Sequence, residues 1–181
     1  MKKIEFITNF REKSKKTPKI DAKNATDLKI RTKFANIKNE DLSYNIFDKS
    51  KSIDKQRELI NKIYMGEEFI EKKFLLSELN NKINSYKQQD IKKDYHEKDN
   101  LITLDNTIVK LVSCKLKCYY CNCNVKILYS ETRDNKQWTL DRLNNYDEHT
   151  DLNTIISCLE CNLQRRRKNS EKFKFTKQIE T

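Results

Sequence analysis

Any fold of this chain has to bring together two pairs of cysteines with identical spacing, Cys118–Cys121 and Cys158–Cys161. A Cys-x-x-Cys turn lets two thiolates reach one ion, and four thiolates at about 2.3 Å close a tetrahedral structural zinc site. Two disulfides, or unrelated buried thiols, are the alternative interpretation. The first residues contain no apolar run typical of a secretion signal, which favours metal binding over disulfides. We therefore expect these four cysteines to hold one structural Zn2+.

Two further cysteines, Cys114 and Cys123, form the poorer spacings Cys-x-x-x-Cys and Cys-x-Cys with their neighbours. We interpret both as spare thiols. Cys123 remains an alternative to Cys121 as a ligand, because only Asn122 separates the two.

Polar residues lie between and after the two cysteine pairs. Residues 138–167 read WTLDRLNNYDEHTDLNTIISCLECNLQRRR, with Asp141 after an alternating stretch, Asn153 before the second pair and Asn162 directly after Cys161. This arrangement resembles the HNH, or ββα-metal, nucleases, especially the zinc-stapled branch that contains phage endonuclease VII. The longer string from the first pair onward also resembles an HNH-like group of large DNA viruses and phages. The resemblance covers about residues 101–168.

The resemblance implies an endonuclease that hydrolyses phosphodiester bonds in DNA, or in RNA, with a catalytic Mg2+ or Mn2+ beside the structural zinc. Asp141 and Asn162 would hold the catalytic ion, in keeping with the oxygen ligands that magnesium prefers. Asn153 would tie down the loop of a hairpin by hydrogen bonds. Four basic residues would bind the nucleic acid: Arg165, Arg166, Arg167 and Lys168.

Arg142 stands where most members of that family carry the general-base histidine. An arginine stays protonated in proteins and cannot accept a proton from water, although it can neutralise a phosphate. The nearest candidate base is His149, followed by Tyr146 and the pair Tyr119–Tyr120. A loop histidine that caps or orients the turn is the competing interpretation of His149.

The chain of 181 residues has a net charge of +11, and charged and hydrophobic residues each make up 36%. The core must therefore be small, and a basic surface suits a polyanionic partner. A single glycine argues against a Gly-rich phosphate loop. No stretch approaches the ~20 apolar residues of a membrane span. We expect no membrane contact and an intracellular, reducing compartment, which is the cytoplasm or nucleus of the host cell for a viral protein.

We expect an α+β fold, in which a small zinc-stapled ββα-metal module at the C-terminal side follows a mostly helical, partly flexible N-terminal region. Residues 1–52 are interpreted as a basic, poorly structured arm and residues 53–100 as a helical extension. Residues 101–181 form the module.

One apolar stripe is expected in the extension, after a helix break at Gly66: Leu76, Leu79, Ile83 and Tyr86 fall at helical spacing. The stripe packs on the module or, in a sharper interpretation, forms a homodimer through the helices of residues 53–94.

Period-two alternation predicts strands over residues 126–130 and 137–143 in the module. In the second strand, Trp138 and Leu140 point into the core and Asp141 points to the open face. A helix from Asn106 leads to the first cysteine pair, and the last helix begins near Cys158 or Cys161. Phe173 and Phe175 predict a short closing strand.

Two other classes of function remain open. A non-catalytic zinc protein that binds DNA or RNA, such as a viral transcription factor, suits the cysteine pairs and the basic tail equally well. The missing base histidine favours that class, whereas Asp141 and Asn162 favour the nuclease. A structural adaptor that uses the helices of residues 53–94 for a partner is the third class.

Overall fold

The structure, a computed structural model, describes residues 52–95 and 100–179. Its elements follow the order α3 (Ile53–Tyr64), α4 (Lys72–Ile91), α5 (Leu104–Ser113), β1 (Trp138–Arg142), β2 (Thr154–Cys158), α6 (Leu159–Arg165) and α7 (Ser170–Ile179). The expected α+β class is confirmed. Apart from Ser52, the arm assigned to residues 1–52 lies outside the described residues.

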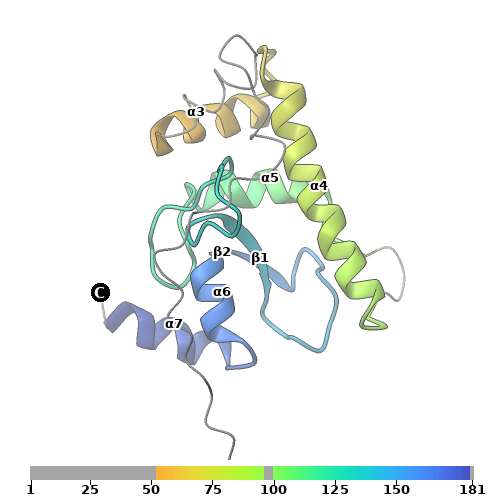
Figure 1. The fold of residues 1–181 in the computed structure, drawn as a ribbon, viewed down its shortest axis with the longest axis vertical. Coiled ribbons are helices and arrows are strands. Elements are labelled where there is room, and N and C mark those ends of the chain that lie inside the picture. Colours follow the sequence, from red (N-terminus) through yellow and green to blue (C-terminus); the bar gives the residue numbers. More distant parts are fainter. Residues whose placement is uncertain (1–51, 96–99, 180–181) are drawn as a thin grey trace, which may run out of the picture.

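A two-stranded antiparallel hairpin, followed directly by α6, forms the centre of the C-terminal half (Figure 1). In the register of the hairpin, Trp138 faces Cys158 and Asp141 faces Ile155. Trp138 and Leu140 are each 1% exposed, so the side of β1 that was expected to face the core does so. The two strands and α6 thus follow one another directly along the chain.

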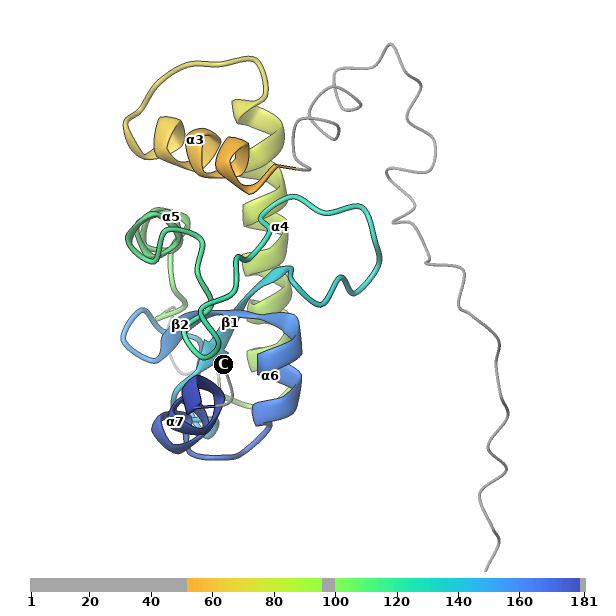
Figure 2. The same cartoon turned by 90° about the vertical axis from the view of Figure 1, so that its left-hand side faces the viewer.

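The helices α4 and α5 lie beside this hairpin, α3 packs on α5 on the side away from the strands, and α4 runs along most of the molecule's length (Figures 1 and 2). The expected break at Gly66 is confirmed, because its φ of 74° belongs to the left-handed region that favours glycine. The predicted stripe of α4 is buried, with Leu75 fully buried in place of the half-buried Leu76.

The stripe of α4 belongs to the same hydrophobic core as the hairpin. That core runs from Leu59 of α3 through Leu79 of α4 to Trp138 and Phe173. Residues 53–100 and the C-terminal module therefore share one core. The stripe therefore packs on the module, and the homodimer through the helices of residues 53–94 stays a prediction.

Residues 126–130 form no strand, so that expectation is wrong. Their single ladder contact is an isolated bridge between Lys126 and Gln137. The Gln56 side chain takes the place of a neighbouring strand, because its Oε1 accepts the backbone N–H groups of Ile127 (2.7 Å) and Leu128 (3.0 Å). Its Nε2 donates to the Leu128 carbonyl at 3.3 Å.

The expected closing strand around Phe173 and Phe175 is also wrong, since both residues lie in the helix α7. In a strand the two rings would share one face. Here Phe173 is 7% exposed and packs edge-on against Tyr120, with ring centroids 5.0 Å apart, whereas Phe175 is 69% exposed. Asn169 supports the start of α7 by accepting the Lys172 N–H at 3.1 Å.

Within the described ranges, none of the helices combines the length and the apolar character needed to cross a membrane.

Candidate metal centre and anion pocket

The structure gathers the four expected cysteines, Cys118, Cys121, Cys158 and Cys161, into one cluster. Their sulfur atoms all lie within 4.8 Å of one another, and those of Cys121 and Cys158 are 3.9 Å apart. Tetrahedral zinc–sulfur bonds of about 2.3 Å place two sulfurs about 3.8 Å apart. The donor set therefore fits a Zn2+ ion.

Local structure explains how the two pairs meet. Cys158 ends β2 and is the N-cap of α6, where its sulfur accepts the Cys161 N–H at 3.4 Å. The first pair lies in a turn that pairs with β2 through the Tyr119 N–H and the Ile156 carbonyl at 2.9 Å. Hydrogen bonds from Cys123, Cys158 and Cys161 lower the pKa of Cys118. A low pKa favours the thiolate that a metal requires.

The two remaining cysteines differ in their surroundings. The Cys114 thiol lies outside the cluster and donates to the Leu111 carbonyl at 3.4 Å. Burial raises the pKa of Cys114. The Cys123 thiol instead interacts with Cys118 and Cys158, so it lies at the edge of the cluster. Cys123 thus remains the neighbour that could exchange with Cys121.

Asp141 is 4% exposed and does not lie on an open face as expected. Its Oδ2 accepts Tyr120 Oη and Arg165 Nε, both at 2.6 Å, and its Oδ1 accepts Arg165 Nη2 at 2.8 Å. Burial alone would lower the pKa of Arg165, but the bonds to Asp141 outweigh it and raise that pKa. The expected phosphate contact Arg165 is thus an internal clamp between α6 and β1.

Asn153 lies where its expected role requires. Its Oδ1 accepts the Asn144 N–H at 2.8 Å, and its Nδ2 donates to the carbonyls of Asn144 (3.0 Å) and Glu148 (2.8 Å). These three bonds span the loop between β1 and β2. Asn153 holds that loop in shape and is buried, at 8% exposure.

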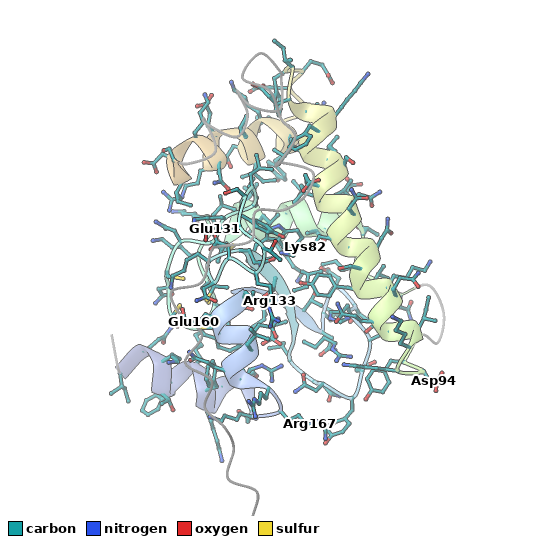
Figure 3. The ribbon with its side chains drawn as sticks, viewed as in Figure 1. Lys82, Asp94, Glu131, Arg133, Glu160 and Arg167 are labelled. Atoms are coloured by element: carbon teal, nitrogen blue, oxygen red, sulfur yellow. The ribbon has the colours of Figure 1, made fainter. Side chains whose placement is uncertain are left out.

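A hollow of about 570 Å3 opens between the C-terminal ends of α4 and α6. Figure 3 labels Asp94, just past the end of α4, and Arg167, just past the end of α6. Four of the five predicted catalytic residues line the hollow together with three further cations and three tyrosines: Asp141, Arg142, His149 and Asn162, with Lys93, Arg166, Arg167, Tyr86, Tyr95 and Tyr146. We call this hollow the anion pocket.

The charge of the anion pocket is positive. Among its described lining residues Asp141 is the sole carboxylate, and Arg165 already neutralises it. Burial and then the positive charge of Arg142 lower the pKa of Lys93, the Asp90 charge raises it, and Arg167 lowers it further. Cations that destabilise one another in this way favour a bound anion.

His149 is held by a buried carboxylate from another part of the chain. Its Nδ1 lies 2.7 and 2.8 Å from the two carboxylate oxygens of Asp90 on α4, and its backbone N–H donates to the same group at 2.9 Å. Asp90 is 1% exposed and also lies 3.6 Å from Arg142 Nη1. A carboxylate only accepts hydrogen bonds, so Nδ1 donates and the ring lone pair is on Nε2.

The tyrosine alternatives to His149 are less suited to accept a proton. Burial, with the Asp141 charge, raises the pKa of Tyr120, whose hydroxyl donates to that carboxylate. The hydrogen bond to Glu171 raises the pKa of Tyr119 to about 12. Tyr146 is 74% exposed on the pocket rim, without a base beside it in the described hydrogen bonds.

Comparison with protein-family models, with curated proteins and with solved structures found no match.

The roles that two residues play in the site were not predicted from the sequence. Asp90 lies on the apolar face of α4, four residues after Tyr86, and an acid in that position is the signal that could have revealed it. Arg165 was expected to bind nucleic acid together with Arg166, Arg167 and Lys168, and its pairing with Asp141 was not predicted. Nothing in that run of basic residues distinguishes the buried member from the exposed Arg166 and Arg167.

The surroundings of His149 predict a pH-dependent stability. Burial lowers the pKa of His149 below 6.5, although the Asp90 charge raises it, and Arg142 lowers it further. The unfolded chain therefore takes up a proton near pH 6.5 that the folded chain refuses. This contribution to stability is complete above pH 6.5 and is lost as the pH falls through the lowered pKa. Its slope cannot exceed about 1.4 kcal/mol per pH unit, the value for one proton.

Thermal unfolding measured between pH 5.5 and 8 tests this expectation. We expect the melting temperature of the wild type to fall more steeply below pH 6.5 than that of His149→Gln. The cysteine cluster adds its own pH dependence, which both proteins share. Identical slopes for the two proteins would show that His149 is not buried as a neutral ring.

Proposed function

We propose that the chain is an HNH-like endonuclease that hydrolyses phosphodiester bonds of DNA in the anion pocket. The observation that carries the proposal is the pair Asp90–His149, which presents a neutral imidazole to a pocket lined by Arg142, Arg166 and Arg167. A base held by a buried carboxylate, next to cations for a phosphate, is the arrangement that phosphodiester hydrolysis needs.

His149 acts as the general base in this proposal. The described residues give no hydrogen bond to its Nε2, which is the ring atom left to accept a proton. Water attacks phosphorus as Nε2 takes its proton, a new oxygen–phosphorus bond forms, and the bond to the leaving 3′ oxygen breaks. The leaving oxygen is protonated from solvent. Arg166 and Arg167, both exposed, neutralise the non-bridging oxygens.

Arg142 acts mainly on the geometry of the base. Its Nη1 donates to the Asp147 carbonyl at 2.7 Å, and its guanidinium lies 5.3 Å from the centre of the Tyr95 ring. Arg142 therefore fixes the hairpin loop that carries His149. Both Arg142 and His149 contact the Asp90 carboxylate. Arg142 stands where most HNH nucleases carry the base histidine. In this proposal it positions His149, which lies farther along the same loop.

The donor set for a catalytic metal is small. An ionised carboxylate has about four acceptor sites, and three on Asp141 are used. One remains on Oδ1, and Asn162, whose Nδ2 donates to Thr139 Oγ1 at 3.1 Å, can offer its amide oxygen. These two oxygens fit a largely hydrated Mg2+ or Mn2+, which supplies charge stabilisation at the leaving oxygen. Because Arg165 neutralises the charge of Asp141, we expect binding of Mg2+ or Mn2+ to be weak and cleavage to need millimolar concentrations of either ion.

Replacement of His149 by glutamine tests the proposal. The loss of a general base costs about 100-fold or more, so we expect nicking of plasmid DNA at a millimolar Mg2+ concentration to slow by at least about 100-fold. Asp90→Asn should slow it as well, because asparagine can stabilise the wrong tautomer of the ring. It should also move the acid limb of the pH–rate profile to lower pH, since Asp90 raises the pKa of His149.

Asp94→Asn is the matched control for Asp90→Asn. Asp94 lies just past the same helix and is exposed, and its left-handed φ of 55° is one that asparagine tolerates. We expect wild-type nicking from this variant. Full activity of His149→Gln would refute the assigned base, and equal losses in Asp90→Asn and Asp94→Asn would refute the positioning role.

The second candidate is a zinc protein that binds DNA or RNA without cutting it. The two hydrogen bonds from the Arg165 guanidinium to the Asp141 carboxylate favour this candidate, because the guanidinium neutralises the negative charge that a catalytic cation would need. Cleavage that is absent at every Mg2+ and Mn2+ concentration, with retention of labelled DNA by the wild type and its loss in Arg166→Gln/Arg167→Gln, would establish this alternative.

A further inference from the structure

A second hollow, of about 1010 Å3, lies between α6 and α7, and we call it the α7 groove. Leu163 and Arg166 line both this groove and the anion pocket, so the two are adjoining parts of one surface. Its other cations are Lys168, Lys172 and Lys177, and none of its described lining residues is acidic.

The floor of the groove is rigidly tied to the anion pocket. The Phe173 ring is 7% exposed and lies beneath the ammonium groups of Lys168 and Lys177, at 5.9 and 6.0 Å. The same ring packs edge-on against Tyr120, whose hydroxyl donates to Asp141. A displacement of α7 would therefore disturb the buried pair below the pocket, and the groove is held in a fixed position relative to it.

We propose that the α7 groove holds the strand that flanks the scissile phosphate, so that the nucleic acid runs from the anion pocket across Arg166 onto α7. This inference rests on the proposed function, because it places the scissile phosphate in the anion pocket. A row of cations without a lining carboxylate suits a sugar–phosphate backbone, and the Leu163 side chain, which is 49% exposed, offers an apolar side to sugars and bases.

The geometry of α7 separates its polar faces. Glu171 points away from the groove and accepts the Tyr119 hydroxyl at 2.5 Å. The nearest acid of this helix is thus occupied on the opposite side, and Lys172 is left exposed toward the groove. Two lysines of α7, Lys172 and Lys177, thus line the groove, while Lys174 lies over the Tyr119 ring on the side of Glu171.

The test is a salt titration of binding with two single-stranded oligonucleotides, of about 4 and about 16 nucleotides, measured by fluorescence anisotropy without added Mg2+. Each single-strand phosphate contact contributes about 0.7 to the slope of log K against log salt. For Lys172→Gln/Lys177→Gln we expect the slope with the longer probe to fall by about 1.4, and its affinity to drop about 20-fold at 0.1 M salt. The short probe is expected to occupy the anion pocket alone. The groove variant should therefore bind the short probe with the same affinity as the wild type.

The control variant Lys73→Gln/Lys117→Gln removes the same charge from two exposed lysines that line neither the pocket nor the groove. We expect it to leave the slope unchanged. Equal slopes for the groove variant, the control and the wild type would overturn the inference. So would displacement of the long probe by poly-glutamate as effectively as by unlabelled oligonucleotide, which would indicate an acidic peptide as the occupant.

The inference and the proposed function fail in different ways. If the groove variant loses slope while the wild type never cuts DNA, the groove stands and the nuclease is refuted. If the wild type cuts DNA and the groove variant binds with an unaltered slope, the nuclease stands and the groove is refuted. Equal zinc content and melting temperature in all variants exclude a loss of fold as the cause.

Discussion

Cys158→Ser is expected to abolish the folding of the C-terminal half. The apparent binding free energy of a structural zinc is about 10–16 kcal/mol in small zinc-folded units, comparable to or larger than the ~5–15 kcal/mol of a whole domain. Cys158 is fully buried, ends β2 and caps α6, so its loss removes a metal ligand at the point where strand and helix join. Zinc per chain by mass spectrometry and thermal unfolding by circular dichroism measure the effect.

Cys114→Ser is the matched control, since its thiol lies outside the cluster and bonds backbone groups near it in the chain, among them the Leu111 carbonyl at 3.4 Å. We expect the Cys114→Ser protein to hold one zinc per chain and to unfold in a cooperative thermal transition. A Cys158→Ser protein with full zinc and a wild-type melting temperature would refute the zinc site.

The same measurement separates Cys121 from Cys123. With Cys121 as ligand, Cys121→Ser loses zinc and Cys123→Ser keeps it. The reverse outcome would show that the thiol at the edge of the cluster is the true ligand, as its interactions with Cys118 and Cys158 allow.

The cysteine cluster was predictable because coordination needs few residues at a fixed spacing. Two Cys-x-x-Cys turns suit one tetrahedral ion, and the structure brings their four sulfurs together. The role of Asn153 was predictable for a similar reason, because its three hydrogen bonds stay within its own loop. In both cases the decisive contacts are local, or are specified by a repeated pattern.

The pairings of Asp141 and His149 were not predictable in the same way. Asp141 is bonded by Arg165 and Tyr120, and His149 by Asp90, at separations of 21 to 59 residues along the chain. Hydrophobic periodicity places β1 and α4 correctly, yet it does not say which polar groups meet when they pack. Asp90 was assigned to an extension outside the module, although α4 shares the core of the hairpin and brings this carboxylate to the site.

Gln56 shows the same limit for secondary structure. The alternation in residues 126–130 is a real signal, and Ile127 is buried as a strand residue would be. Strand pairing depends on a partner that offers backbone groups, and here a glutamine from α3 satisfies them first. A side chain 71 residues away thus decides against a strand that the local pattern favours.

Asp141→Ala is expected to destabilise the protein by about 3–5 kcal/mol, because it leaves the Arg165 guanidinium buried without a counter-charge. Arg165 is 1% exposed and also donates to the carbonyls of Arg142 (2.6 Å) and Lys168 (2.9 Å), so it cannot turn out to solvent without breaking those bonds. Urea unfolding followed by circular dichroism, at constant zinc, gives the change in the free energy of unfolding.

Two variants make the result specific. Asp151→Ala removes the partner of a more exposed ion pair, with Lys110 at 3.2 Å, and should cost no more than about 1 kcal/mol. Asp141→Leu/Arg165→Met removes both buried charges and should recover most of the loss, because an apolar pair avoids the desolvation of both ions. A single Asp141→Ala protein as stable as Asp151→Ala would show that the pair is not formed.

The size of this effect decides how the pocket can be tested. Loss of cleavage in Asp141→Ala does not identify a metal ligand, because the same substitution undoes the clamp between β1 and α6. Asn162→Ala is the cleaner probe, since Asn162 is half-buried and gives up one hydrogen bond to Thr139. If the two residues share a catalytic ion, Asn162→Ala raises the Mg2+ concentration needed for half-maximal cleavage while leaving the melting temperature unchanged. An unchanged Mg2+ requirement would leave Arg165 as the only cation that Asp141 binds.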